Sequence, residues 1–492
     1  MSPATRQLPD RLTRRAVGRV IPVAESLIRR QDDGVTDRET HADRSRDSGA
    51  GRHRVVIVGG GFAGLYAARE LGKEPAVELT LVDRRNYHLF QPLLYQVATG
   101  ALSPGDIAQP LRAILRRNQN TRVLLGEAVG LDPVARRIEL NDGGTVDYDT
   151  LIVATGARHA YFGHDEWAPL APGLKTVEDA TEIRRRILIA YEAAEREADP
   201  ARRAEWMTFV VVGAGPTGAE LAGALGEISR DTLRRDFRSI HPADARVLLV
   251  EALDRVLPTY PETLSGSAKR QLERLGVTVR TSTRVTAIDD SGIDVVVGGG
   301  GSDRTERIPA RTILWAAGVH ASSFGRKVAE ALGVETDRAG RVPVGADLTV
   351  AGHREVMILG DLAVATRQGG KVVPGVAPAA IQEGTYAAKS IRRRLRGDAP
   401  EPFRYRDRGD VAVIGRLSGV ADIRWLGRFG QMSGFLAWGM WLGVHIVYLI
   451  GFANRLVVII RWAWSFLTHG RGTRLITGEP HLPPIKQPER LD

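Results

Sequence analysis

One stretch, Arg54–Asp83, limits what this chain can fold into more than any other. The apolar run Val55–Val58 predicts a short buried strand, which leads directly into the turn GGGFAG at 59–64. A helical pattern follows, and then a second apolar strand that ends on Asp83. This order of strand, glycine turn, helix, strand and terminal acid predicts a dinucleotide-binding βαβ unit.

Each residue type in this unit has a physical role. Gly59 permits a tight turn, Gly61 lets the backbone approach a pyrophosphate, and Gly64 lets the helix pack close to the strand. The free N–H groups at the helix N-terminus attract phosphates. Asp83 can accept hydrogen bonds from ribose hydroxyls. A glycine turn with a purely structural role is the alternative interpretation.

The same pattern occurs a second time. A strand is predicted at Phe209–Val212, and the turn after it carries glycines at the same spacing: Gly213, Gly215 and Gly218. A later apolar strand ends on Glu251. A carboxylate there pairs with ribose hydroxyls and repels a 2′-phosphate, which favours NADH over NADPH. Two intact dinucleotide sites indicate two cofactors that exchange electrons, and a degenerate second copy without a ligand is the alternative.

Composition excludes several classes of protein. The chain has 492 residues, enough for two or three domains, and contains no cysteine. The absence of cysteine excludes disulfides, thiolate metal sites, iron–sulfur clusters and dithiol redox chemistry. The formal net charge is +10. Acids are interleaved with arginines in the polar segment 1–52, so we expect a mostly disordered, solvated arm and no nucleic-acid partner.

Three further apolar segments end on small or acidic residues: 151–156, 313–318 and 356–361. Small residues at these ends permit the close passage of backbone and cofactor. An aspartate after the third strand can bind the hydroxyls of a flavin dinucleotide. A plain buried strand is the default alternative for each segment. The residues singled out at these ends are Thr155, Gly156, Gly360 and Asp361.

The remaining central segments carry weaker signals. We interpret the polar insert 229–245 as a helix extension and a loop. Short apolar segments at 123–125, 137–140 and 146–148 predict a small β-meander. His88 lies in an aromatic, amide-rich segment, and we interpret it as a structural histidine rather than a proton relay.

The C-terminal region is apolar, basic and rich in tryptophan. No acid occurs from Ile423 to Gly478, and five of the eight tryptophans lie there. The run Phe435–Ala453 is about long enough to span a bilayer, and Leu456–Leu467 is too short to span one. Trp and Arg favour the membrane interface, so an interfacial anchor is expected. A membrane span and a buried dimerisation helix pair remain as alternatives, and His445 is interpreted as structural.

Together these motifs resemble the type II NADH dehydrogenases, single-subunit non-pumping NADH:quinone oxidoreductases within the two-dinucleotide-binding-domain flavoprotein superfamily. The most specific segment is HLFQPLLYQVATG at 88–100, supported by VAPAAIQEG at 376–384 and by the apolar C-terminus. The resemblance covers about 54–478. It implies an α/β fold with two Rossmann-like, glutathione-reductase-like domains, the NADH domain inserted into the FAD domain, and a C-terminal membrane-associating helical region.

The resemblance also implies domain boundaries and residue roles. The FAD-binding domain would comprise 53–165 and 340–397, the NADH-binding domain 166–339, and the membrane-anchoring region 398–492. FAD would be bound by Gly59, Gly61, Gly64, Asp83, Thr155, Gly156, Gly360 and Asp361, and NADH by Gly213, Gly215, Gly218 and Glu251. Glu220 would lie where nicotinamide and flavin meet, although a structural role at the helix N-terminus is nearly as well supported. Gln382 and Glu383 would lie near the flavin ring and the quinone channel. Pro378 departs from the family pattern, which has glutamine there, so the site could rest on Gln382 alone.

The implied reaction is hydride transfer from NADH to FAD, followed by two-electron reduction of a membrane quinone (menaquinone or ubiquinone) without proton pumping. The enzyme would sit on an anionic lipid surface at the cytoplasmic face of the cell membrane, and a homodimer is possible. One alternative is a soluble NAD(P)H flavoprotein reductase that donates to a small redox protein. Another is a non-catalytic, nucleotide-sensing membrane protein.

Overall fold

The structure is a computed structural model that describes residues 51–298, 303–367, 369–399, 401–468, 470–478 and 482. Residues from His53 onward form one compact unit, separate from the unit 1–52. The arm expected at 1–52 therefore lies outside the described residues, except for its last two positions.

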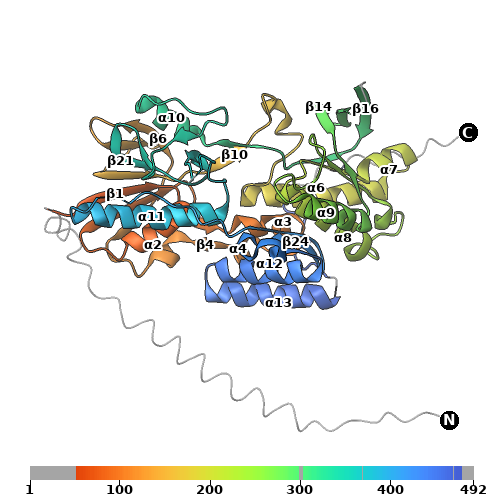
Figure 1. Cartoon of the computed structure of the whole chain (residues 1–492). Helices are drawn as coiled ribbons and strands as arrows, with labels where there is room; N and C mark the ends of the chain where they lie inside the picture. The colour runs from red at the N-terminus through yellow and green to blue at the C-terminus, as the bar shows by residue number, and fades with distance from the viewer. Residues whose placement is uncertain are drawn as a thin grey trace, which may run out of the picture. The chain divides into compact units, whose positions relative to one another are not determined.

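The first glycine turn belongs to a six-stranded sheet (Figure 1). In spatial order its strands are β20 (Thr349–Val350), β21 (His353–Ile358), β9 (Thr150–Val153), β1 (His53–Val58), β2 (Val77–Asp83) and β5 (Thr121–Leu125). Every neighbouring pair is parallel except β20 and β21. This is the doubly wound arrangement that the first fingerprint predicts.

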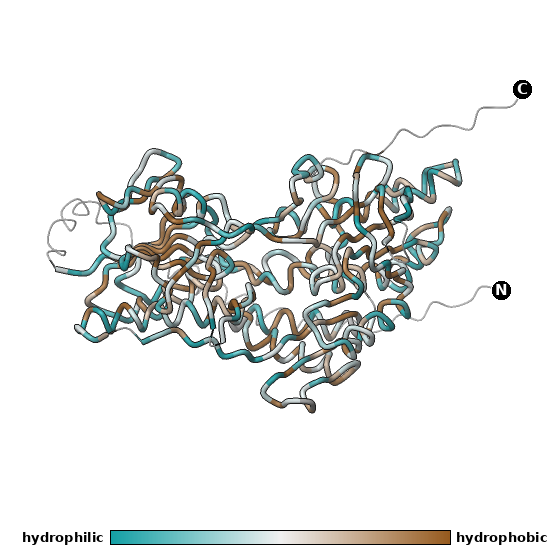
Figure 2. Tube along the Cα trace, turned by 45° about the horizontal axis from the view of Figure 1, so that its top comes forward, coloured by the Kyte–Doolittle hydropathy of each residue, from teal (hydrophilic) through white to brown (hydrophobic). Residues whose placement is uncertain are grey.

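Alternation along β1 explains how both faces of this sheet are covered. Val55 and Ile57 pack in the core with α2 (Phe62–Leu71) and α11 (Ala377–Leu395). Val56 and Val58 point to the other face, where α10 (Ser323–Ala331) lies. Because successive side chains of a strand alternate, one apolar run serves two cores. Figure 2 shows the apolar strands gathered in this layer.

The small meander differs in part from the prediction. It consists of β6 (Ala128–Asp132), β7 (Arg137–Leu140) and β8 (Thr145–Asp147). The segment 123–125, which we expected in the meander, belongs to β5 and extends the parallel sheet beside β2. Sequence alternation cannot distinguish a meander strand from the edge strand of a parallel sheet, because both are short and half-buried.

The second glycine turn belongs to a four-stranded parallel sheet. Its strands are, in spatial order, β13 (Val277–Arg280), β12 (Arg246–Val250), β11 (Thr208–Val212) and β17 (Thr312–Trp315). One face packs on α6 (Val177–Arg196), α8 (Pro216–Glu227) and α9 (Glu262–Arg274), and the other on the antiparallel strands β14 (Thr283–Asp289), β15 (Gly292–Val297) and β16 (Arg304–Pro309). The insert after α8 forms a helical extension at Ile228–Thr232 and a short helix at Pro242–Asp244, as predicted.

Two crossover strands connect the segments that carry these sheets. β10 (Ala157–His159) pairs antiparallel with β18 (Val319–Ala321).

The segment between β2 and β5 forms several short elements: β3 (Tyr87–Leu89), α3 (Leu94–Ala98), α4 (Pro104–Ile107), β4 (Ala108–Pro110) and α5 (Leu111–Leu115). Other short elements are α7 (Pro200–Trp206), β19 (Val342–Pro343) and β22 (Ala363–Val364).

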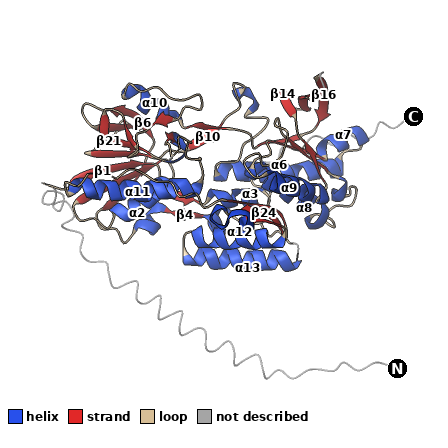
Figure 3. Cartoon of the chain, in the orientation of Figure 1, coloured by secondary structure: helices blue, strands red, loops and turns tan. Residues whose placement is uncertain are grey.

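The C-terminal region contains a small sheet that the sequence did not reveal. Its strands β23 (Asp410–Gly415), β24 (Ser418–Asp422) and β25 (Gln431–Ser433) precede two helices, α12 (Phe435–Tyr448) and α13 (Phe452–Thr468) (Figure 3). The apolar run 435–453 is therefore not one helix, since it breaks at 449–451, where Gly451 has φ +91°. Within the described part of the chain, no helix has both the length and the apolar character needed to cross a membrane.

Candidate functional site

The first glycine turn leaves no room for side chains on its inner side. A Cβ added to Gly59 (φ +105°) would lie 2.4 Å from the Ala154 carbonyl oxygen, and one added to Gly64 would lie 1.8 Å from the Gly59 oxygen. At Gly61 a Cβ would meet no atom within 4 Å. Gly59 and Gly64 thus hold the backbone together, while Gly61 keeps an open approach at the start of α2.

Asp83 is fixed by the turn that it faces. One carboxylate oxygen accepts a hydrogen bond from Gly60 N–H at 2.5 Å, and the other from Arg85 N–H at 2.7 Å. Burial raises the pKa of Asp83 above its ordinary value. The carboxyl group is therefore held at the end of β2 before any ligand is bound.

The main cavity starts at this turn and has a volume of about 470 Å³. Residues expected to bind FAD line it at one end, and residues of α8 line it at the other. Its predicted members are Gly59, Gly61, Asp83, Thr155, Gly156, Gly360, Asp361 and Glu220. Gly64 does not line the cavity, because it packs beneath the turn. A phosphate-binding turn, a ribose acceptor and apolar walls along one cavity fit FAD.

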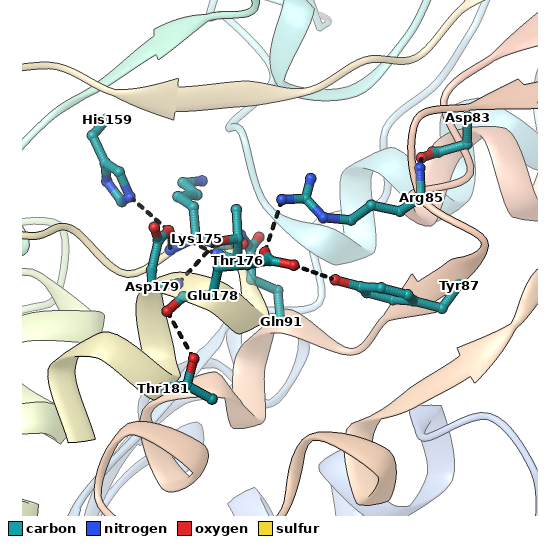
Figure 4. A network of polar contacts seen from close by, with 10 residues as sticks. All are labelled: Asp83, Arg85, Tyr87, Gln91, His159, Lys175, Thr176, Glu178, Asp179 and Thr181. Carbon is teal, nitrogen blue, oxygen red and sulfur yellow. Dashed lines mark hydrogen bonds and ion pairs between the residues drawn. The ribbon is translucent and has the colours of Figure 1, made fainter. Parts of the chain in front are cut away.

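A polar network lies along one side of the cavity (Figure 4). The sequence motifs did not predict it. Arg85 donates to Glu178 at 2.9 Å, and the Tyr87 hydroxyl lies 3.5 Å from the same carboxylate. Lys175 lies 3.8 Å from Asp361. These contacts tie the loop after β2 and the strand end at Asp361 to the start of α6. The partners are distant in the sequence, so no local spacing signals them.

The second glycine turn repeats the geometry of the first. A Cβ on Gly213 (φ +98°) would lie 2.7 Å from Ala317 N, and one on Gly218 would lie 1.8 Å from the Gly213 oxygen. Gly215 is open. Glu251 accepts a hydrogen bond from Ala214 N–H at 2.6 Å, as Asp83 does from its own turn. The structure thus brings together all four residues predicted for the second nucleotide.

Glu220 lies on α8, shortly after the second glycine turn, and its side chain is half-buried. Its carboxylate is the acceptor for the Val413 N–H at 3.4 Å. Burial raises the pKa of Glu220 to about 8, so the side chain carries a proton at neutral pH. Glu220 and Tyr95 each line the main cavity and also a second, smaller one.

The second cavity, of about 140 Å³, lies between α8, β23 and the two C-terminal helices. Trp438, Trp441 and Trp462 are among its lining residues. Trp462 donates to Gln96 at 2.7 Å, and Gln96 donates to the Tyr95 hydroxyl at 2.9 Å. The sequence placed Tyr95 and Gln96 in a characteristic segment but gave them no role.

Gln382 and Glu383 lie on α11, the helix that also supplies Ala377 and Ala380 to the wall of the main cavity. Neither side chain lines either cavity. Gln382 exchanges hydrogen bonds with the backbone of Arg406 at 3.0 and 2.9 Å. Glu383 is buried and accepts a hydrogen bond from Gly360 N–H at 2.5 Å, and burial raises its pKa to about 8. Glu383 thus holds Gly360, which lines the main cavity, and Gln382 holds the backbone at Arg406.

The two histidines left as structural are buried. His88 Nδ1–H donates to the Gly60 carbonyl oxygen at 3.0 Å, and His445 Nδ1–H donates to the Trp441 oxygen at 2.7 Å. Burial lowers the pKa of each to about 4. Both imidazoles are therefore neutral, and His88 stabilises the first glycine turn.

Comparison with known proteins places this geometry in a family. Residues 53–384 match the family model described as pyridine nucleotide-disulphide oxidoreductase. The chain is 48% identical over 437 residues to the type II NADH:quinone oxidoreductase NdhA of Mycobacterium tuberculosis, which covers 87% of this chain and 90% of that protein. A type II NADH:quinone oxidoreductase of Staphylococcus haemolyticus is 29% identical over 78% of this chain and 93% of that protein.

Solved structures share the fold. The structure of NDH2 from Plasmodium falciparum in complex with NADH matches with a TM-score of 0.77, at 19% identity, over 84% of this chain and 98% of that chain. The sulfide:quinone oxidoreductase of Aquifex aeolicus matches with a TM-score of 0.62, at 19% identity, over 81% of this chain and 90% of that chain. At such identities the likeness concerns the fold alone.

Proposed function

The chain belongs to the type II NADH:quinone oxidoreductases, within the pyridine nucleotide-disulphide oxidoreductase family, and we propose that it oxidises NADH and reduces a membrane quinone without pumping protons. The single observation that carries the proposal is that two cavities share Tyr95 and Glu220 in their walls. The main cavity fits FAD, and the second is walled by helices of the apolar C-terminal region. The electron donor and the electron acceptor would thus each use a separate cavity to reach the region of Tyr95 and Glu220.

We assign the binding of FAD to the residues around the first turn. Gly61 leaves the pyrophosphate an approach to the N-terminus of α2, and Asp83 accepts from ribose hydroxyls. The remaining proposed FAD ligands are Gly59, Gly64, Thr155, Gly156, Gly360 and Asp361. Gly213, Gly215, Gly218 and Glu251 are proposed to hold NADH. When bound, FAD accepts a hydride from NADH and passes two electrons to the quinone.

Glu220 is proposed as the proton source inside the protein. The overall reaction takes up one proton from solvent, because NADH supplies a hydride and a quinol carries two hydrogens. A carboxyl group with a pKa near 8 is protonated at neutral pH and lines both cavities. Gln382 and Glu383 are assigned a supporting role: Glu383 holds Gly360, and Gln382 holds the irregular segment that leads to β23.

The proposed division into domains follows the two parallel sheets. The FAD domain comprises 53–165 and 340–397, the NADH domain 166–339, and the membrane-anchoring region 398–492. Each glycine turn lies at the carboxyl edge of its own sheet, where open α/β sheets bind ligands. The crossover strands β10 and β18 lie near the proposed boundaries.

We propose that α12 and α13 rest on an anionic membrane surface, on its cytoplasmic side. Large apolar side chains of both helices are exposed: Phe435, Leu436, Val447, Ile460, Trp464 and Leu467. Exposed apolar rows combined with arginines and no acids suit an interfacial anchor. Replacing Leu436 and Leu467 with glutamate should abolish co-sedimentation with anionic vesicles and leave reduction of a water-soluble quinone intact. Menaquinone and ubiquinone are the candidate acceptors, and a homodimer is the proposed assembly.

The proposed function is tested by steady-state oxidation of NADH by the purified flavoprotein with a water-soluble quinone analogue. NADH loss should match quinone loss one to one, and NADPH should be a poor donor because the Glu251 carboxylate proposed to bind the ribose would repel a 2′-phosphate. Electrons that pass to a small iron–sulfur protein but not to any quinone would establish the reductase alternative. Tight NADH binding without any turnover would favour a nucleotide sensor.

A further inference from the structure

We propose that Phe162 binds the nicotinamide nucleotide, with its ring as a stacking surface beside the second glycine turn. The proposal rests on the proposed function in one respect, namely that NADH is the electron donor. Neither the glycine fingerprint nor the acid at the end of β12 includes this residue, because it lies in the loop that follows the crossover strand β10.

The position of the ring is set by close contacts. A Cβ added to Gly318 would lie 2.4 Å from Phe162 Cζ, so the tip of the ring presses on the backbone there. Gly318 directly follows Ala317, whose nitrogen would lie 2.7 Å from a Cβ on Gly213. The backbone under the ring and the backbone that touches the nucleotide turn therefore belong to consecutive residues.

Packing in the hydrophobic core does not explain the position of the Phe162 side chain. Phe162 is 70% exposed, although the Trp315 ring lies at a centroid distance of 6.3 Å. Its backbone has φ 55°, a left-handed conformation that is costly for a bulky non-glycine residue. An exposed aromatic ring held in a strained conformation is characteristic of a binding site rather than of a core.

Neighbouring contacts fix the loop so that the ring is preorganised. The Tyr161 hydroxyl donates to the Ala171 oxygen at 2.8 Å, and the Trp315 indole donates to the Ala160 oxygen at 3.0 Å. Both residues beside Phe162 on its N-terminal side are thus anchored. The Phe162 ring is itself uncovered on most of its surface. A planar nicotinamide or adenine ring is the ligand that suits such a face.

Two variants distinguish aromatic stacking on the nucleotide from a non-specific apolar contact with it. Phe162→Trp keeps an aromatic face, while Phe162→Leu keeps apolar volume without one. Leucine tolerates the left-handed backbone in this chain, since Leu257, Leu348 and Leu417 all have positive φ. Val134→Ala, which trims an exposed side chain at the turn between β6 and β7, is the control.

The measurements are the Kd for NAD⁺, by equilibrium titration of the FAD-loaded protein, and the KM for NADH with a water-soluble quinone. Phe162→Leu should raise both at least about fivefold, the effect expected from losing one stacking contact. Phe162→Trp and Val134→Ala should leave both near the wild-type values, and all three should retain FAD.

Equal Kd and KM in the leucine and tryptophan variants would overturn the proposal. Loss of FAD or of thermal stability in Phe162→Leu with unchanged NAD⁺ binding would also overturn it, by showing that the ring only braces the crossover strands. Failure of the proposed function is a separate result, because wild-type protein would then bind NAD⁺ without reducing quinone.

Discussion

Asp83 and Glu251 each hold their own glycine turn by a hydrogen bond from its backbone. The acids that are expected to receive ribose hydroxyls therefore already have a structural partner. This arrangement fixes the orientation of each carboxylate before the nucleotide arrives. A preorganised acceptor binds its ligand without a further ordering cost. The sequence predicts the ribose-binding role of the terminal acid, and its structural role at the turn becomes visible only in the structure.

The glycines of the first turn predict two distinct mutant phenotypes. Gly64→Ala places a Cβ 1.8 Å from the Gly59 oxygen, so the turn must open, and the protein should lose thermal stability and FAD together. Gly61→Ala meets no protein atom, so the FAD-free protein should keep its stability while its affinity for FAD falls at least about tenfold. Thermal melts and flavin titration distinguish the two. Equal loss of stability in both variants would contradict the assignment of Gly61 to the pyrophosphate.

Glu220 predicts a dependence of stability on pH. Its pKa rises from the usual 4.5 to about 8 on folding, so between these values the folded chain holds a proton that the unfolded chain has released. The free energy of unfolding therefore falls with rising pH, by up to about 1.4 kcal/mol per pH unit. Glu220→Gln removes this contribution. Between pH 5.5 and 7.5, the free energy of unfolding measured with urea should fall by about 2 to 3 kcal/mol less in the variant than in the wild type. Parallel curves of unfolding free energy against pH would contradict burial of this carboxyl group.

At the scale of elements, the segment after α13 returns to contact α8 and the segments beside α3 and α8. Arg471 donates to the Thr99 oxygen at 3.1 Å and pairs with Glu227 at 2.9 Å. Arg474 pairs with Asp236 on the helical insert. The C-terminal helices are therefore held at both ends, by β23–β25 before them and by this segment after them.

The Arg471–Glu227 pair predicts a large stability effect, because only 8% of the arginine side chain and 18% of the glutamate side chain are exposed. Arg471→Met leaves the carboxylate unpaired and should cost about 3 kcal/mol. Arg474→Met removes an exposed pair and should cost less than about 1 kcal/mol. Chemical denaturation of both variants measures the contrast. A small, equal cost would mean that the segment is not docked in solution.

Element boundaries show what local sequence could and could not reveal. The strands and helices of both fingerprints form as predicted, because turn glycines and apolar runs act over a few residues. The segment 123–125 was assigned to the wrong sheet, since pairing with β2 is a long-range property. The run 435–453 breaks near its C-terminal end, where Gly451 takes a left-handed conformation beside Gln109. Composition alone gives no sign of that break.

At the scale of the molecule, the candidate site was only half visible in the sequence. The nucleotide residues were identified because their motifs are local. The second cavity was not, because it depends on contacts such as Gln96 with Trp462, 366 residues apart. Glu220 was named from its motif, but its position between two cavities required the structure. The resemblance predicted a position near the quinone channel for Gln382, and only the structure shows that its amide binds the backbone of Arg406.

The proposed function requires that NADH and the quinone reach one site through different cavities. The most direct test is anaerobic stopped-flow kinetics of both half-reactions in the wild type and in Ala101→Trp, which narrows the second cavity. NADH should bleach the flavin at the wild-type rate in the variant, while reoxidation by quinone should slow at least about tenfold. Equal reoxidation rates, or a slower reduction by NADH instead, would contradict the claim.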